Sequence, residues 1–113
     1  MTADVFTAVA DPLRRRLLAR LREQGPLSLS ELAAPLAVTR QAVTKHLDAL
    51  ARAGLVRVTR EGRERVHRLD PAPLREVDEW LRPYAEEWDE RLARLRAHLD
   101  ERPPQGPDPE ERP

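Results

Sequence analysis

The sequence contains no cysteine, which excludes disulfide bonds, thiolate metal ligands and cysteine nucleophiles. Only 4% of its 113 residues are aromatic and 35% are charged. No apolar run approaches the ~18 residues that a membrane-spanning helix needs. Residues 1–6 include neither a basic segment nor an apolar one, so we expect no export signal. The expectation is a cytoplasmic protein with one modest core.

Net charge is also absent, because 20 Lys and Arg balance 20 Asp and Glu. That total argues against a nucleic-acid-binding protein, but the distribution of charge argues for one. Residues 1–69 contain 13 basic and 7 acidic side chains, whereas residues 70–113 contain 7 basic and 13 acidic ones. Residues 38–69 alone hold eight basic side chains against three acidic ones. The zero total conceals a basic half and an acidic half.

Two helices are predicted near the N-terminus. Val5, Phe6 and Val9 suit a short amphipathic helix, and Asp11 followed by Pro12 is typical of an N-cap and first helical residue. The second helix then carries leucines at 3.6-residue spacing and should end at Gly25.

The next two helices form a helix-turn-helix pattern. Ser28 and Glu31 read as a capping box for a helix of about two turns, because Pro35 interrupts it early. Thr39 is the N-cap candidate of a helix over 39–53 that should end at Gly54. Two short helices joined by a brief turn, the second with a basic outer face, are typical of DNA-binding proteins.

Two strands around a glycine-containing turn are predicted over 56–69, directly after the second helix of that pair. A basic hairpin in this position makes a winged helix-turn-helix. The predicted fold is mainly α with a two-stranded β-wing: four helices, two strands and a long final helix. The predicted winged domain, with its terminal helices, covers residues 1–101. Residues 102–113 are rich in proline and have no large apolar side chain to bury, so we expect a disordered tail.

The final helix is expected to begin at the Asp70–Pro71 pair and to continue to about residue 101. A helix of ~30 residues is ~45 Å long, so its apolar stripe needs a partner helix and dimerisation follows. Trp80, Tyr84 and Trp88 recur at i, i+4 and i+8 on this helix. They favour dimer packing, with a ligand pocket as the alternative. Pro83 should kink the helix or leave a carbonyl unpaired.

The candidate DNA-reading side chains are on the outer face of helix 39–53, near its start. Arg there would read guanine, Gln would read adenine, and Thr would contact a thymine methyl group or a phosphate. Wing arginines could reach phosphates or the minor groove, although charged edge strands also serve to prevent aggregation. The predicted DNA-binding residues are Thr39, Arg40, Gln41, Thr44, Lys45, Arg60, Arg63 and Arg65.

Metal binding and catalysis find little support in the sequence. His46, His67 and His98 are on different predicted elements, without the spacing of metal ligands. The two serines, Ser28 and Ser30, are both explained by helix capping, and no phosphate loop is present. We therefore predict no metal, no cofactor and no enzyme activity.

Three segments resemble the ArsR/SmtB family of bacterial winged-helix repressors: Val5 to Leu18, Ser30 to Ala33 and Gln41 to Val56. The wing motif Arg60-Glu-Gly-Arg63 and the segment from Trp88 to Leu92 are most similar to a metal-independent branch of it. The cysteine pair of the arsenic and cadmium sensors is replaced by Ser28 and Ser30. The last helix also lacks the histidine and acidic pairs of the zinc sensors.

The resemblance implies a homodimer, formed by the first and last helices, that binds a palindromic operator and represses transcription. It places the DNA-reading positions on Arg40, Gln41, Thr44 and Lys45, the same face as above. The expected dimer interface comprises Val5, Phe6, Val9, Leu81, Trp88, Leu92, Leu95 and Leu99.

The predicted partners are therefore a double-stranded DNA operator, a second copy of the chain and an effector of unknown identity. Two alternatives stay open: a winged helix used for protein–protein contact, and a metal-responsive repressor.

Overall fold

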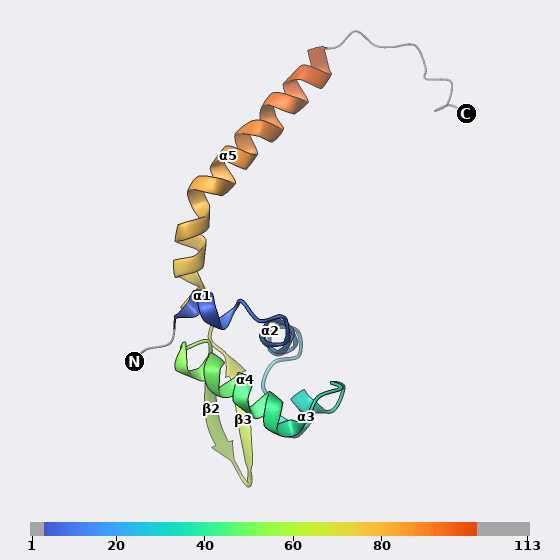
Figure 1. Ribbon diagram of the computed structural model, residues 1–113, viewed down its shortest axis with the longest axis vertical. Coiled ribbons are helices and arrows are strands. Elements are labelled where there is room, and N and C mark those ends of the chain that lie inside the picture. The colour runs from blue at the N-terminus through green and yellow to red at the C-terminus, as the bar shows by residue number, and fades with distance from the viewer. Residues whose placement is uncertain (1–3, 102–113) are drawn as a thin grey trace, which may run out of the picture. The chain divides into compact units, whose positions relative to one another are not determined.

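The computed structural model describes residues 4–101 of the chain, so the proposed tail over 102–113 is outside the described residues. The chain divides into two compact units, Met1–Glu79 and Trp80–Pro113. The elements, labelled in Figure 1, are α1 (Val5–Ala8), α2 (Pro12–Gln24), β1 (Leu27–Ser28), α3 (Leu29–Ala33), α4 (Arg40–Arg52), β2 (Val56–Glu61), β3 (Glu64–Leu69) and α5 (Leu74–Glu101). The fold is mainly helical with a small antiparallel sheet, as predicted.

Helix starts follow the predicted capping residues. The Asp11 carboxylate accepts from the backbone N–H groups of Leu13 and Arg14, with Pro12 as first helical residue of α2. Ser28 and Glu31 form the expected capping box at α3. This helix is short, since Pro35 has no N–H with which to continue the ladder.

The end of α4 is set by Gly54, which has a φ of +81°. The Leu55 N–H donates to the Leu50 carbonyl at 2.9 Å across this glycine, as in a Schellman motif. The turn directs the chain from α4 into β2.

The core of the first unit lies where α2, α3 and α4 meet the base of the sheet. Its fully buried large side chains are Leu17, Leu32, Leu50, Leu55 and Val43. Leu74 and Val77, from the first turns of α5, are partly buried against this core. The core therefore fixes the inner face of α4 and leaves its outer face to solvent.

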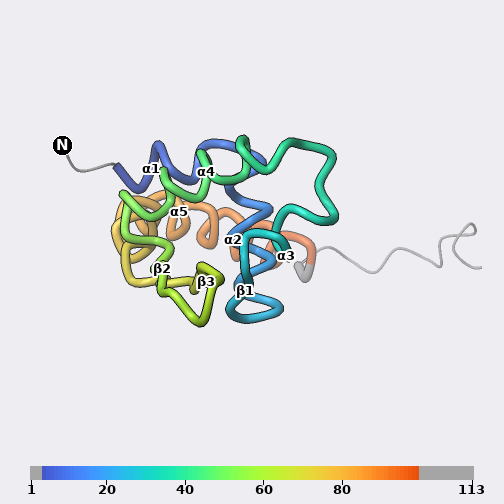
Figure 2. The backbone as a smooth tube through the Cα atoms, turned by 90° about the horizontal axis from the view of Figure 1, so that it is seen from below, coloured from blue at the N-terminus to red at the C-terminus, as the bar shows by residue number. Residues whose placement is uncertain are grey.

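The sheet has three strands, one more than the two predicted. Its order is β1-β3-β2, and Leu27 and Ser28 pair with His67 and Val66 of β3 (Figure 2). A two-residue strand is too short to show the alternation that identifies strands in a sequence. The proposed order of elements therefore needs this extra strand before α3.

The last helix begins at Leu74 and not at the Asp70–Pro71 pair, so the proposed cap was wrong. The Asp70 carboxylate does accept from the Ala72 N–H at 3.1 Å, but it stabilises a turn that precedes the helix. The N–H groups of Leu74, Arg75 and Glu76 donate to carbonyls three residues back, those of Pro71, Ala72 and Pro73, so a tighter turn precedes the α-helical ladder. Further along, α5 continues through Pro83 as one helix to Glu101.

Candidate nucleic-acid interface

The start of α4 exposes most of the side chains predicted to contact DNA. Thr39 caps the helix, its hydroxyl accepting from the Ala42 N–H at 3.0 Å. Arg40, Gln41 and Lys45 are exposed and Thr44 is half-buried. The opposite face of α4 is buried through Val43, Leu47 and Leu50. The helix therefore has a buried apolar face and an exposed polar face at its N-terminal end.

Arg14 connects three helices behind this surface. Its Nε donates to His46 Nδ1 on α4 at 3.0 Å, and its guanidinium also donates to the Thr7 carbonyl near the end of α1 at 3.3 Å. Neither Arg14 nor this role of His46 is evident from sequence spacing, because the partners are 32 residues apart.

The hairpin β2–β3 extends past α4 toward the bottom of Figure 1, with its turn at the far end. Glu61 pairs with Glu64, so the turn is a two-residue loop of Gly62 and Arg63. Gly62 has a φ of +67°, which a type II′ turn requires at its first central position. The turn therefore holds the Arg63 position at the end of the wing.

The five wing arginines fall into two groups. Arg57 pairs with Asp70 at 2.9 Å and Arg68 pairs with Glu61. The backbone N–H of Ala72 and the side chain of Arg57 lower the pKa of Asp70 below its usual value. Among the described residues, no carboxylate forms a salt bridge with Arg60, Arg63 or Arg65. Of the five wing arginines, the three predicted to contact DNA are the ones that form no salt bridge with a described carboxylate.

The register of the hairpin also places Arg60 directly opposite Arg65. Side chains alternate along a strand, so these two arginines are on the same face as Val58 and His67, which pack inward. Like charges opposite each other on a sheet are unfavourable without a counter-ion. This inner face at the tip of the wing is therefore a place where an anion is stabilising.

The start of α4 and the turn of the wing come together at one surface hollow. It has a volume of about 220 Å³, and Arg40, Arg63 and Arg65 are among the residues that line it. Ser30 lines it too, and its hydroxyl accepts a hydrogen bond from the Arg40 guanidinium. Ser30 is therefore not a capping residue, and the sequence-based explanation of it was wrong.

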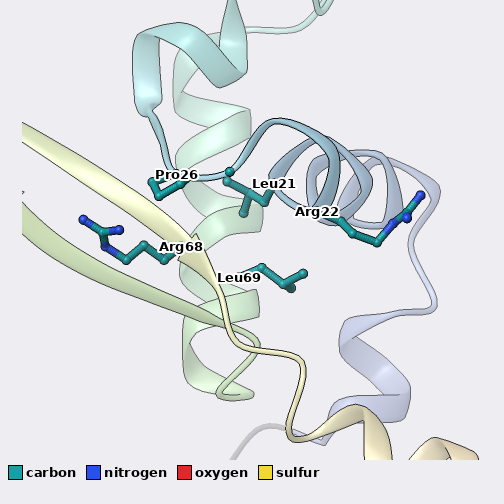
Figure 3. Close-up of a pocket in the computed structure, with 6 residues that line it drawn as sticks. Leu21, Arg22, Pro26, Arg68 and Leu69 are labelled. Atoms are coloured by element: carbon teal, nitrogen blue, oxygen red, sulfur yellow. The ribbon is translucent and has the colours of Figure 1, made fainter.

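A second hollow, of about 390 Å³, is located where the α2–β1 connection meets the end of β3 (Figure 3). Leu21, Pro26 and Leu69 line it, and the side chains of Arg22 and Arg68 point to opposite sides in Figure 3. Polar groups do not converge here as they do in an active site.

The histidines of the described residues do not form a metal site. His46 is bonded to Arg14, His67 is buried in the sheet, and no group of three or more His, Asp or Glu residues between positions 4 and 101 could hold a metal ion. In the same range no helix is long and apolar enough to cross a membrane.

The second unit is the part of α5 from Trp80 onward, and it presents an apolar face. Trp80 and Tyr84 pack ring against ring at 5.2 Å between centroids. About half of the surface of each large side chain remains accessible at Trp80, Leu81, Tyr84, Trp88, Leu95 and Leu99. Leu92 is half-buried.

The first helix contributes less free surface to the expected dimer interface than α5 does. Val5 is only 4% exposed and belongs to the core of its own chain. Phe6 and Val9 are partly buried against that core. Val5 therefore has almost no surface left to offer a partner.

Comparison with known proteins gives the family. Residues 9–59 match the model of a helix-turn-helix domain. The chain is 39% identical over 79 residues to the HTH-type transcriptional regulator YuzN of Bacillus subtilis, covering 65% of this chain and 86% of that protein. It is 46% identical over 69 residues to the HTH-type transcriptional regulator Rv2034 of Mycobacterium tuberculosis, covering 61% and 64%.

Among solved structures, the fold matches an ArsR-like transcriptional regulator from Rhodococcus sp. RHA1 with a TM-score of 0.63. Sequence identity is 40%, and the match covers 84% of this chain and 89% of that one. The predicted family and fold are thereby confirmed, and regulators of this kind are generally not enzymes. The chain belongs to the ArsR family of winged helix-turn-helix, DNA-binding transcriptional regulators.

Proposed function

We propose that this regulator is a homodimeric repressor that binds a palindromic operator in the cytoplasm. The observation that carries the proposal is the exposed polar start of α4 beside wing arginines that form no salt bridge with any carboxylate between residues 4 and 101. In helix-turn-helix proteins the second helix enters the major groove with its N-terminal residues against the bases. Gln41 and Thr44 are suited to base edges, and Lys45 to a phosphate.

The wing is proposed to contact the DNA backbone beside that groove through Arg60, Arg63 and Arg65. Arginine is suited to this role because its guanidinium donates two parallel hydrogen bonds to a phosphate. The paired arginines, Arg57 and Arg68, have less to gain, since each already has an acidic partner.

A mobility shift with the DNA upstream of the chain's own gene tests the proposal. The wild-type chain should retard this fragment and not a scrambled duplex of equal length. Lys45→Ala should weaken binding and reduce the slope of log affinity against log salt by about 0.9, because one phosphate contact is lost.

Arg52→Ala is the matched control for that variant. Arg52 is a basic, exposed residue of the same helix at its opposite end, so its removal should leave both quantities almost unchanged. Equal retardation of the specific and scrambled duplexes would contradict sequence-specific binding.

The dimer is proposed to form through the apolar face of α5, which comprises Leu81, Trp88, Leu92, Leu95 and Leu99. Large apolar side chains that stay this exposed between residues 81 and 99 of a helix are stable in water when a partner covers them. Phe6 and Val9 are proposed at the edge of this interface.

A further inference from the structure

The hollow between α4 and the wing has the size and composition of an anion site. Its volume of about 220 Å³ exceeds the ~30 Å³ that one water occupies, so a phosphate group fits. Its polar lining comes from three places along the chain, namely the start of α3, the start of α4 and the wing turn. The residues concerned are Ser28, Ser30, Arg40, Arg63, Glu64 and Arg65.

The residues that line the hollow carry more positive than negative charge. Three arginines, Arg40, Arg63 and Arg65, line it together with one acidic residue, Glu64. No salt bridge joins the Glu64 carboxylate, or any other among the described residues, to the three arginines. Because Arg57 and Arg68 on the same hairpin are both paired, the hollow differs from the rest of the wing.

Two contacts prepare the hollow for an anion. Ser30 accepts a hydrogen bond from the Arg40 guanidinium and so restricts that side chain at the hollow's edge. Arg65 has Arg60 as its directly opposed cross-strand neighbour, so a second positive charge lies beside Arg65. A bound anion relieves this repulsion, so binding is favoured by what is already present in the free protein.

We propose that this hollow is a binding site for a single backbone phosphate of DNA, which Arg40 of α4 binds jointly with Arg63 and Arg65 of the wing. The proposal rests on the proposed function and deepens it. One phosphate shared by two elements ties the recognition helix and the wing to the same point on the duplex, which fixes the register of reading. It assigns Arg40 to the backbone, in place of the guanine contact expected from the sequence.

A double-mutant cycle tests whether Arg40 and Arg63 bind the same phosphate. It uses a duplex that the wild-type chain has selected from a random pool. Arg40→Ala and Arg63→Ala should each weaken binding about tenfold, as expected for a charged hydrogen bond. Together they should cost much less than the hundredfold product, because both act on one phosphate. The double variant should lower the salt slope by about 0.9, the value for one phosphate, and not by about 1.8.

The control pair is Arg40→Ala with Lys45→Ala, two residues proposed to contact different groups. Their losses should multiply. Glu64→Gln should tighten binding, since it removes a negative charge beside the bound phosphate. Arg40→Ala should weaken binding to the selected and scrambled duplexes by the same factor, as a backbone contact does.

Replacing single phosphates of the selected duplex by uncharged methylphosphonates identifies the bound group. One linkage per half-site should lower wild-type affinity, and at that linkage Arg40→Ala and Arg63→Ala should have no further effect. If the affinity losses of Arg40→Ala and Arg63→Ala multiply, or if no such linkage is found, the shared phosphate site is wrong. DNA binding itself would still stand. Failure of the wild-type chain to enrich any duplex would overturn the proposed function, and the shared phosphate site with it.

Inorganic phosphate, added at constant ionic strength, distinguishes the other source of the same chemistry. It should displace the duplex only weakly. The contrary result is that millimolar phosphate shields Arg63 and Arg65 from an arginine-modifying reagent while no methylphosphonate lowers the affinity. The hollow then binds free phosphate, and the proposed site for a DNA phosphate is wrong.

Discussion

At the scale of the residue, His67 couples the small sheet to pH. Its side chain is 6% exposed, it has Leu27 and Val58 as its cross-strand partners, and its Nδ1 is 3.4 Å from the Leu27 carbonyl oxygen. Burial disfavours the charged ring and lowers the pKa of His67 below 6.5. The unfolded chain therefore binds a proton at a higher pH than the folded chain does.

Because the folded pKa is the lower one, we predict that His67 lowers the free energy of unfolding in acid. Its contribution to the free energy of unfolding is complete above the unfolded pKa of 6.5 and is lost as pH falls through the lower folded pKa. Thermal unfolding at pH 7.5 and pH 5.5 checks this. The Tm of the wild-type chain should fall more between these pH values than that of His67→Leu. Equal falls would show that His67 does not titrate on unfolding.

The two serines of α3 give a second prediction at this scale. Ser28 is buried and caps the helix, whereas Ser30 is exposed and accepts from Arg40. Ser28→Ala should lower the free energy of unfolding by about 1 kcal/mol. Ser30→Ala should change it by less than about 0.5 kcal/mol and should weaken DNA binding instead. Urea unfolding of both variants separates these roles, and a reversed order would contradict the assignment.

At the scale of the element, most of the fold could be predicted from the sequence, because the residues that start and end helices act locally. Asp11, Ser28 and Thr39 cap helices as expected, and Gly54 ends α4. Features that depend on distant partners were missed. The strand β1 exists because it pairs with β3, about 40 residues away, and nothing within its two residues could indicate that.

The same division holds for the candidate site. The exposed start of α4 follows from the spacing of Val43 and Leu47, which the sequence displays. The hollow that joins Arg40 to the wing depends on how the hairpin folds back against α3 and α4, which spacing alone does not specify. The sequence separated Arg60, Arg63 and Arg65 from Arg57 and Arg68 only by their closeness to the turn of the wing. That Arg57 and Arg68 pair with acidic residues is a tertiary property, which spacing does not specify.

The prediction that belongs to α5 concerns assembly. Leu92→Glu combined with Leu95→Glu should convert the proposed dimer to a monomer, because charged side chains on that face would be buried without partners. Light scattering measures the mass, and circular dichroism checks that the helices remain. Glu86→Gln with Glu87→Gln, two exposed changes on the same helix, should leave the mass unchanged. A persistent dimer in the leucine variant would place the interface elsewhere.

At the scale of the whole molecule, a chain with no net charge joins a basic half to an acidic one. Arg40, Lys45, Arg60, Arg63 and Arg65, at the start of α4 and in the wing, form no salt bridge with any carboxylate of the described residues. The zero total limits nonspecific attraction to DNA, whereas the local arrangement favours specific contacts. Charge counted along the chain is therefore the informative quantity.

The central claim is that two copies of α4 read successive major grooves of one duplex. Hydroxyl-radical footprinting of the wild-type chain on its selected duplex tests this most directly. We predict two protected half-sites with their centres about 34 Å apart, one turn of DNA, flanked by backbone protection that Arg63→Ala removes. A single protected patch, or no protection at concentrations that retard the duplex, would contradict the claim.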